Sequence, residues 1–449
     1  MGRLAPTAIA LVVTAGIAGC GGGHHSTQIP PLVTTGSGAG GATVKTTPPP
    51  PQLEIDASVP STGPDASFGR AELNGMKLAL ANAGERAGTY TIDFDWKDIG
   101  SRTSGWSAKT LAAFAAKSAT SQDAIAYIGD LASSASQVSI PILNTAGIPQ
   151  IVPGSPDTRL FPTQAAAGGQ HAAPVQTPTN YVRLAPSNVY QAIAILDWLH
   201  TTDPSCTRLA LPYGADPDGE DLAGLLARLS RSYQLTPIGY QAARPIAPGS
   251  SAKYMQTLTR DRANCAVYSG TIAGGAVAVT EALHEALAPG AKIVGSSGVC
   301  TSAWTNPAQG GVIPTRTEPD LDCAAPGPGL GLTPAGKFFQ TAYKHDYKAE
   351  PEPAAAYGYE AMELILNTIA ELGQEGNSRA SVLNALHVEP QSNSVIGSFS
   401  FKSSGDTTNT DYSIYGVAPG GSLKFLRTVR ANAASPAAGV ASDSGRTAS

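Results

Sequence analysis

From Gln52 onward, the chain alternates short apolar runs with amphipathic stretches, and this alternation restricts its fold more than any other feature. The apolar runs have the length of buried strands, and the amphipathic stretches have the length of helices. Strands that alternate with helices are typical of βαβ units, which build parallel sheets. The first predicted strands are 53–59, 90–96, 124–129 and 150–153, and predicted helices between them include 71–83 and 108–119.

A second series of the same kind follows a predicted strand at 181–184. Its predicted strands are 208–213, 235–240, 266–270, 292–295 and 311–315. The sequence therefore predicts an α/β fold with two doubly wound parallel-sheet lobes. In such sheets ligands bind at the carboxyl ends of the strands, so two facing lobes form a binding cleft between them.

The composition excludes several kinds of partner. Charged residues make up only 14% of the 449 residues and the net charge is -5, so no basic surface is expected for nucleic acid or anionic lipid. After the N-terminus, no stretch approaches the roughly 20 apolar residues that a membrane-spanning helix requires.

The N-terminus has the pattern of an export signal. Arg3 precedes an apolar stretch at 4–18 that ends in small residues. The following Ile17-Ala18-Gly19-Cys20 resembles the lipobox of bacterial lipoproteins, in which the signal is cut before a lipidated cysteine. We therefore expect a signal at 1–20, a lipid on Cys20 and attachment to the outer face of the cell membrane through that lipid only. The alternative is an ordinary signal with an incidental cysteine.

The two ends of the mature chain are predicted to lack a core. Residues 21–51 are rich in Gly, Thr, Ser and Pro, and residues 431–449 are rich in Ala, Ser and Gly. The first segment is interpreted as a disordered tether and the second as a disordered tail.

Four of the five cysteines remain once Cys20 is set aside, in a compartment that permits oxidation. Cys206 and Cys265 each precede a predicted strand, and the starts of neighbouring parallel strands lie within disulfide reach. We therefore predict the pairs Cys206–Cys265 and Cys300–Cys323. Free thiols are the alternative, whereas zinc is disfavoured because no CxxC pair or nearby histidine completes a ligand set. No other metal site is predicted.

Several segments, in order along residues 52–430, resemble the type I periplasmic binding proteins, especially the branched-chain amino-acid receptors of ABC transporters. The first is Val59-Pro-Ser-Thr-Gly-Pro-Asp-Ala-Ser-Phe-Gly69, which is similar to the family's first ligand loop. The others are 128–135, 146–155, Tyr357-Gly-Tyr-Glu-Ala361, and 397–401 with Gly405-Asp406. Each segment alone is weak evidence, and their common order makes the resemblance strong.

The resemblance implies two lobes joined by three crossings, which we place near residues 184, 317 and 409. Lobe one would then comprise 52–184 and 318–408, and lobe two would comprise 185–317 and 409–430. In this family the lobes close around a solute and present a surface to the permease.

The resemblance also implies ligand-binding residues. Ser133 and Ser134 fall where the family receives the ligand carboxylate at a helix N-terminus, a position that favours anions. Gly154 and Ser155 match the next contact loop, and Phe68 stands where an aromatic ring walls the pocket. Ser133 would equally serve as a plain helix cap, and Phe68 as a core residue.

This chain departs from the amino-acid receptors at several of these positions. Pro156 replaces a threonine and lacks its backbone N–H. Ser297 falls where the family places an acid on the ligand ammonium, while Ile272 and Ala273 replace aromatic residues. Asp218 is a candidate for the missing acid, although an aspartate in an Asp/Pro/Gly turn needs no such function.

We therefore expect an extracytoplasmic solute-binding lipoprotein of an ABC importer, with permease subunits as partners and a small amino-acid-like solute as ligand. A ligand-sensing receptor lipoprotein of the same fold is the alternative, because both functions would use the same residues. An enzyme is disfavoured because the sequence has no GxSxG, HExxH or P-loop motif, and no cofactor is predicted.

Overall fold

The computed structural model describes residues 50–160, 180–214, 216–242, 250–306, 311, 320–418 and 420–431. Several predictions fall outside these residues: the signal, Cys20, nearly all of the tether, the tail, and most of the predicted strand at 311–315. None of the described helices has the length and apolar composition needed to cross a membrane.

The first half of the described chain forms a largely parallel sheet, which we call sheet one. Its strand order is β2-β3-β1-β6-β7-β8, and only the pairing of β2 with β3 is antiparallel. The strands are β1 (Gln52–Val59), β2 (Arg86–Ala87), β3 (Tyr90–Asp98), β6 (Ala124–Ile128), β7 (Gln150–Val152) and β8 (Tyr181–Arg183). A separate pair, β4 (Gly100–Ser101) and β5 (Gly105–Trp106), forms a small hairpin.

Sheet two has the order β10-β9-β11-β12-β13-β14-β15. The strands from β10 to β13 pair in parallel, whereas β14 and β15 are antiparallel additions at one edge. The strands are β9 (Arg208–Tyr213), β10 (Thr236–Ala242), β11 (Cys265–Tyr268), β12 (Ile293–Gly295), β13 (Leu321–Pro326), β14 (Asp411–Val417) and β15 (Leu423–Arg430).

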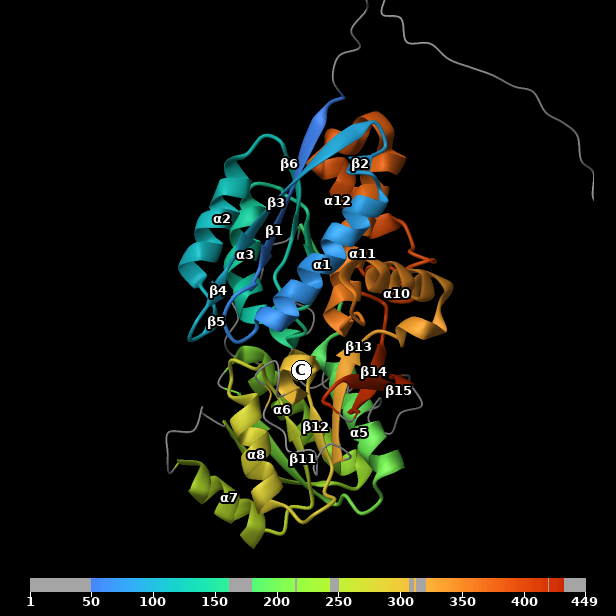
Figure 1. Cartoon of the computed structure of the whole chain (residues 1–449). Coiled ribbons are helices and arrows are strands. Elements are labelled where there is room, and N and C mark those ends of the chain that lie inside the picture. Colours follow the sequence, from blue (N-terminus) through green and yellow to red (C-terminus); the bar gives the residue numbers. More distant parts are fainter. Residues whose placement is uncertain are drawn as a thin grey trace, which may run out of the picture. The chain divides into compact units, whose positions relative to one another are not determined.

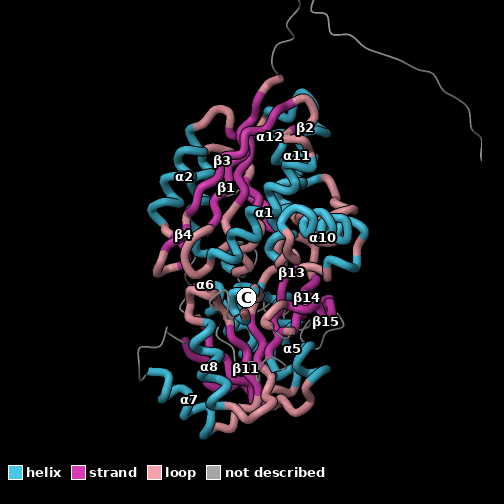
Figure 2. Tube along the Cα trace, in the orientation of Figure 1, coloured by secondary structure: helices cyan, strands magenta, loops and turns pink. Residues whose placement is uncertain are grey.

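Helices cover both sheets (Figures 1 and 2). Lobe one consists of sheet one with α1 (Ala66–Asn82), α2 (Ala108–Thr120), α3 (Ser133–Thr145), α10 (Pro334–Tyr347), α11 (Pro353–Leu372) and α12 (Arg379–Val388). Lobe two consists of sheet two with α5 (Asn188–Thr202), α6 (Pro217–Leu229), α7 (Ser250–Arg260), α8 (Ala276–Ala286) and α9 (Ser302–Thr305). Side chains cap the starts of several helices. At the start of α6, for example, the Asp216 carboxylate accepts the Gly219 N–H, and Pro217 lies in the first turn.

The cores follow from the alternation of side chains along the strands. In sheet two, Leu209 and Leu211 contact α5 and α6 on one face, whereas Ala210 contacts α7 and α8 on the other. In lobe one, α1 packs against α11 even though the two helices are far apart in sequence (Figure 1). Lobe one is therefore discontinuous in sequence, as the two-lobed fold requires.

The chain passes between the lobes after β8, after β13 and before β14. The second crossing was predicted near residue 317, but β13 pairs with β12 and β14 in sheet two, so the crossing follows Pro326. Residues 321–326 therefore belong to lobe two, not to lobe one as predicted. Buried Arg183 at the end of β8 donates to Asp406 at 2.7 Å and thereby joins the first crossing to the third.

Both predicted disulfides are present, and both lie in lobe two. Cys206 and Cys265 join the starts of the adjacent strands β9 and β11, with Cα atoms 5.4 Å apart. Cys300 follows β12 and pairs with Cys323, whose Cα atom lies 5.3 Å away. Cys323 lies inside β13, the strand that the sequence did not predict.

Candidate functional site

A cavity of about 90 Å³ lies between the two lobes. In lobe one it is lined by the loops after β1, β6 and β7 and by parts of α1 and α11. In lobe two it is lined by the loops after β11 and β12 and by parts of α5 and α6. The cavity thus occupies the carboxyl ends of both sets of parallel strands, where this architecture binds ligands.

The predicted ligand residues divide into two groups. Phe68, Gly154, Asp218 and Ser297 line the cavity. Ser133, Ser134 and Ser155 lie in the same loops and helix start but are not among the lining residues. Their proposed contact with a ligand therefore stays a prediction.

Ser133 and Asp218, which were predicted on opposite sides of a ligand, contact each other. The backbone N–H of Ser133, in the first turn of α3, donates to Oδ2 of Asp218 at 3.0 Å. The Ser133 hydroxyl is also engaged, because it accepts the backbone N–H of Asp157 at 3.1 Å. A carboxylate therefore occupies the helix N-terminus as the resemblance implies, but it belongs to the protein itself.

In the loop after β7, the Ser155 hydroxyl bonds within lobe one. Ser155 has a left-handed backbone, with φ of 56°, and its hydroxyl donates to the carbonyl of Asp130 at 3.0 Å. Its neighbour Gly154 is required by close packing, since a Cβ there would lie 2.4 Å from the carbonyl oxygen of Leu131. This contact fixes the loops after β6 and β7 against each other at the wall of the cavity.

Ser297 is held by Gln191 of α5, which the sequence analysis missed. The Ser297 N–H donates to Gln191 Oε1 at 2.8 Å, and the Ser297 hydroxyl accepts from Gln191 Nε2 at 3.0 Å. Both residues line the cavity. No sequence signal marked Gln191, because a glutamine on a helix is ordinarily solvated.

Hydrogen bonds between the lobes surround the cavity. The Ala273 N–H donates to Asp65 Oδ1 at 3.0 Å, and the hydroxyls of Ser67 and Thr301 lie 3.1 Å apart. Further out, the Thr158 N–H donates to Asp221 at 3.1 Å. The two lobes are therefore closed on each other in this structure.

Two carboxyl groups of lobe one, Asp65 and Glu72, also line the cavity and were not predicted. Burial raises the pKa of Asp65, although its hydrogen bond from Ala273 opposes the change. Burial, with the neighbouring Asp130, raises the pKa of Glu72 to about 8. A signal for Glu72 does exist in the sequence, because it falls four residues after Phe68 and four before Met76 on the apolar face of a predicted helix.

Asp218 has the same character on the lobe two side. Burial and the nearby Asp157 and Asp216 raise its pKa to about 8. The cavity therefore carries carboxyl groups from both lobes, and burial raises the pKa of each of them.

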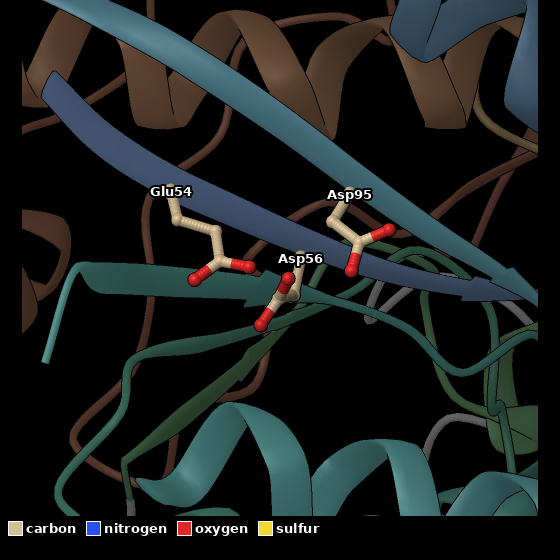
Figure 3. A group of neighbouring side chains, drawn as sticks. All are labelled: Glu54, Asp56 and Asp95. Atoms are coloured by element: carbon tan, nitrogen blue, oxygen red, sulfur yellow. The ribbon is translucent and has the colours of Figure 1, made fainter. Parts of the chain in front are cut away.

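A separate acidic group lies away from the cavity, on β1 and β3 of lobe one. Glu54, Asp56 and Asp95 have carboxylate oxygens within 4.8 Å of one another, which is close enough to hold a metal ion (Figure 3). The ammonium of Lys117 already contacts two of them, at 3.4 Å from Glu54 and in a short contact with Asp95. We therefore infer that Lys117, and not a metal ion, supplies the positive charge that balances these carboxylates.

Comparison with known proteins places these observations in a family. Residues 53–422 match the family described as periplasmic binding protein. No curated protein matches the sequence. Because the match spans most of the chain, the resemblance noted in the sequence is confirmed.

Solved structures show the same fold at low identity. A leucine-binding protein from Thermotoga maritima has a TM-score of 0.68 and 17% identity, with 84% of this chain and 99% of that chain covered. A solute-binding protein of an ABC transporter from R. palustris, in complex with benzoate, has a TM-score of 0.66 and 17% identity, with 85% and 98% covered.

A third structure extends this likeness to another bacterium. The branched-chain amino-acid transporter substrate-binding protein of Streptococcus pneumoniae, in complex with isoleucine, has a TM-score of 0.64 and 18% identity, with 85% and 100% covered. The predicted fold class of two α/β lobes is thereby confirmed. The chain belongs to the type I periplasmic binding protein family.

Proposed function

We propose that this protein is the extracytoplasmic solute-binding lipoprotein of an ABC importer and captures a small, amino-acid-like or related solute. The observation that carries the proposal is the cavity between the lobes at the carboxyl ends of both sheets. The similar structures support it, because they include binding proteins of transporters with isoleucine or benzoate bound.

The proposed mechanism is closure of the lobes on the solute. Opening would break the hydrogen bonds from Ser133 to Asp218 and from Ala273 to Asp65, and would expose the apolar lining to water. A solute that fills the cavity favours the closed form by its differential affinity for that form. The closed pair of lobes would then be the form that the permease subunits recognise.

Attachment to the membrane is proposed to rest on Cys20. A diacylglyceryl group together with an N-terminal acyl chain buries enough methylene groups for stable anchoring. Metabolic labelling with a palmitate analogue should modify the wild-type protein and leave Cys20→Ala unlabelled. Equal labelling of both proteins would contradict the anchor.

A thermal-shift screen of amino acids, amides, amines and small acids tests the binding function. A solute present at 100 times its dissociation constant stabilises the folded protein by about 2.7 kcal/mol, which raises the melting temperature measurably. We expect at least one class of small solute to do so. A panel in which no solute raises the melting temperature would count against solute binding.

A further inference from the structure

The charged groups of the cavity lining are all acidic. Asp65, Glu72 and Asp218 line it, and the described lining residues include no lysine, arginine or histidine. A cavity that receives a carboxylate ligand needs a cation or free N–H donors, and this lining has no cation. Its carboxyl groups, when ionised, are instead complementary to a positively charged solute.

Of these three groups, Glu72 most lacks hydrogen-bond partners. Its side chain is fully buried, and neither carboxylate oxygen has a hydrogen-bond partner. A buried carboxyl group without partners is costly, and a bound donor would offset that cost. Glu72 is therefore a cavity-lining residue with two acceptor atoms that no protein group uses.

Three backbone donors near the cavity are already used by the protein. The N–H of Ser133 donates to Asp218, the N–H of Ala273 to Asp65, and the N–H of Ser297 to Gln191. Pro156, which also lines the cavity, has no N–H. A carboxylate that bound at any of these three N–H groups would have to displace an internal acceptor, and Asp218 already holds the position at the start of α3.

Asp218 has acceptor capacity left. Its Oδ2 accepts from Ser133, while Oδ1 is buried without a partner. The aromatic rings of Phe68, Trp106 and Tyr357 complete a lining that is otherwise mainly apolar. Aromatic rings and carboxylates together suit an ammonium group on an apolar body.

We propose that the cavity binds a small organic amine in its cationic form, with Glu72 as the main acceptor of the ammonium group and Asp218 as a second acceptor. This inference rests on the proposed solute-binding function and narrows its ligand class. The cavity is smaller than the engineered apolar cavity of about 150 Å³ that accepts benzene, so the apolar body holds only a few carbons.

Three probes that share one carbon skeleton test the charge preference directly. Isopentylamine carries the ammonium alone, 4-methylpentanoate carries the carboxylate alone, and leucine carries both. We expect isopentylamine to raise the melting temperature of the unmodified protein and to bind in calorimetry, and the other two to do neither. Binding of 4-methylpentanoate or leucine in preference to isopentylamine overturns the inference and leaves the solute-binding function intact.

Glu72→Gln tests the assigned acceptor, and Glu360→Gln is its matched control. Glu360 is a glutamate of α11 that is also buried, but it does not line the cavity. We expect Glu72→Gln to weaken isopentylamine binding at least about 30-fold and Glu360→Gln to leave it unchanged. Equal affinity in Glu72→Gln and the parent overturns the role of Glu72.

Three further outcomes are also decisive. If Glu72→Gln does not fold, the probe comparison on the unmodified protein still decides the charge preference. If isopentylamine fails but another solute of the wider panel binds, a cationic solute supports the inference and a neutral or anionic one overturns it. If no solute of the panel binds, the proposed function itself fails.

Discussion

The two lobes differ in how they accommodate buried acidic side chains. In lobe two, Asp322 lies 3.1 Å from the ammonium of Lys292, and Asp411 lies 2.7 Å from the guanidinium of Arg430. In lobe one, four buried carboxyl groups have no lysine or arginine nitrogen of the described residues within 4.0 Å, and they are Asp56, Glu72, Asp130 and Glu360.

Because of this difference, the stability of each lobe should depend differently on pH and on reducing conditions. Burial raises the pKa of Asp130 to about 6, of Asp56 to about 7, and of Glu360 to about 8. Lobe one therefore holds protons that its unfolded chain would release. Lobe two instead carries both disulfides. We infer that reduction acts mainly on lobe two, whereas pH acts on the buried carboxyl groups of lobe one and on Asp218 at the cavity side of lobe two.

The largest expected effect is loss of the lobe two disulfides. Their sequence separations of 59 and 23 residues correspond to about 4 and about 3.5 kcal/mol of loop-closure free energy. Replacing Cys206 and Cys265 with serine should therefore destabilise more than replacing Cys300 and Cys323. Denaturant unfolding gives the two free energies.

Hydrogen exchange by peptide then locates the effect. Faster exchange should be confined to peptides of lobe two, because all four cysteines lie there. Faster exchange in β1 or α1 to the same degree would show that the lobes unfold as one unit, and the comparison between them would not hold.

The second prediction concerns the pH response of lobe one. The pKa of Glu72 is raised from 4.5 to about 8, so between these pH values the folded protein holds a proton that the unfolded chain has released. The free energy of unfolding should then fall as pH rises from about 4.5 to about 8 and become level above this range. Glu72→Gln should remove this part of the slope and stabilise the unliganded protein at pH 8 by about 1–3 kcal/mol.

Glu360→Gln is again the matched control, since its carboxyl group accepts the Val395 N–H at 3.1 Å whereas Glu72 has no partner. The gain in stability at pH 8 should be smaller for Glu360→Gln. A Glu72→Gln protein whose stability declines with pH as steeply as the parent would contradict the pKa assignment.

The fold was predictable because its signals are local. Apolar runs marked β6 and β9, alternating apolar residues marked β1, and amphipathic periodicity marked α1 and α2. The strand β13 was missed because Leu321-Asp-Cys-Ala-Ala-Pro326 has only one large apolar residue. Asp322 is buried there only because Lys292 and the indole N–H of Trp198 meet its carboxylate, and that tertiary contact leaves no sequence pattern.

The site was predictable only as a set of loops. Phe68, Gly154, Asp218 and Ser297 line one cavity, and their contact with a ligand stays a prediction. Which atoms remain available to a ligand depends on contacts between the lobes. The bond from Ser133 to Asp218 joins residues far apart in sequence, so no local pattern could show that the protein fills its own anion position.

The third prediction tests that internal contact. Asp218→Ala removes the acceptor of the Ser133 N–H and should cost about 0.5–1.5 kcal/mol of unfolding free energy as a lost hydrogen bond. The freed N–H at the start of α3 should then give 4-methylpentanoate measurable binding in calorimetry.

Asp221→Ala is the control for this variant. Asp221 also accepts a hydrogen bond across the lobes, from Thr158, but it does not line the cavity. It should lose at least as much stability, because Asp221 also accepts from the Thr158 hydroxyl and from Asn188, without gaining carboxylate binding. Equal gain in both variants would indicate that loosening the lobes, not freeing Ser133, admits the anion.

The smallest effect is expected at the acidic group on β1 and β3, where Lys117 supplies the only ammonium within 4.0 Å among the described residues (Figure 3). Lys117→Met keeps an apolar stem over the ring of Phe114 and removes the charge. Because the Lys117 side chain is 54% exposed, solvent screens the interaction, and the loss should be about 0.2–1 kcal/mol at low salt.

The loss should be larger at pH 8 than at pH 5, because Asp56, with a pKa of about 7, is charged only at the higher pH. It should vanish in about 1 M salt, where the screening length is about 3 Å. A loss that persists in high salt would mean that Lys117 acts through packing and not through its charge.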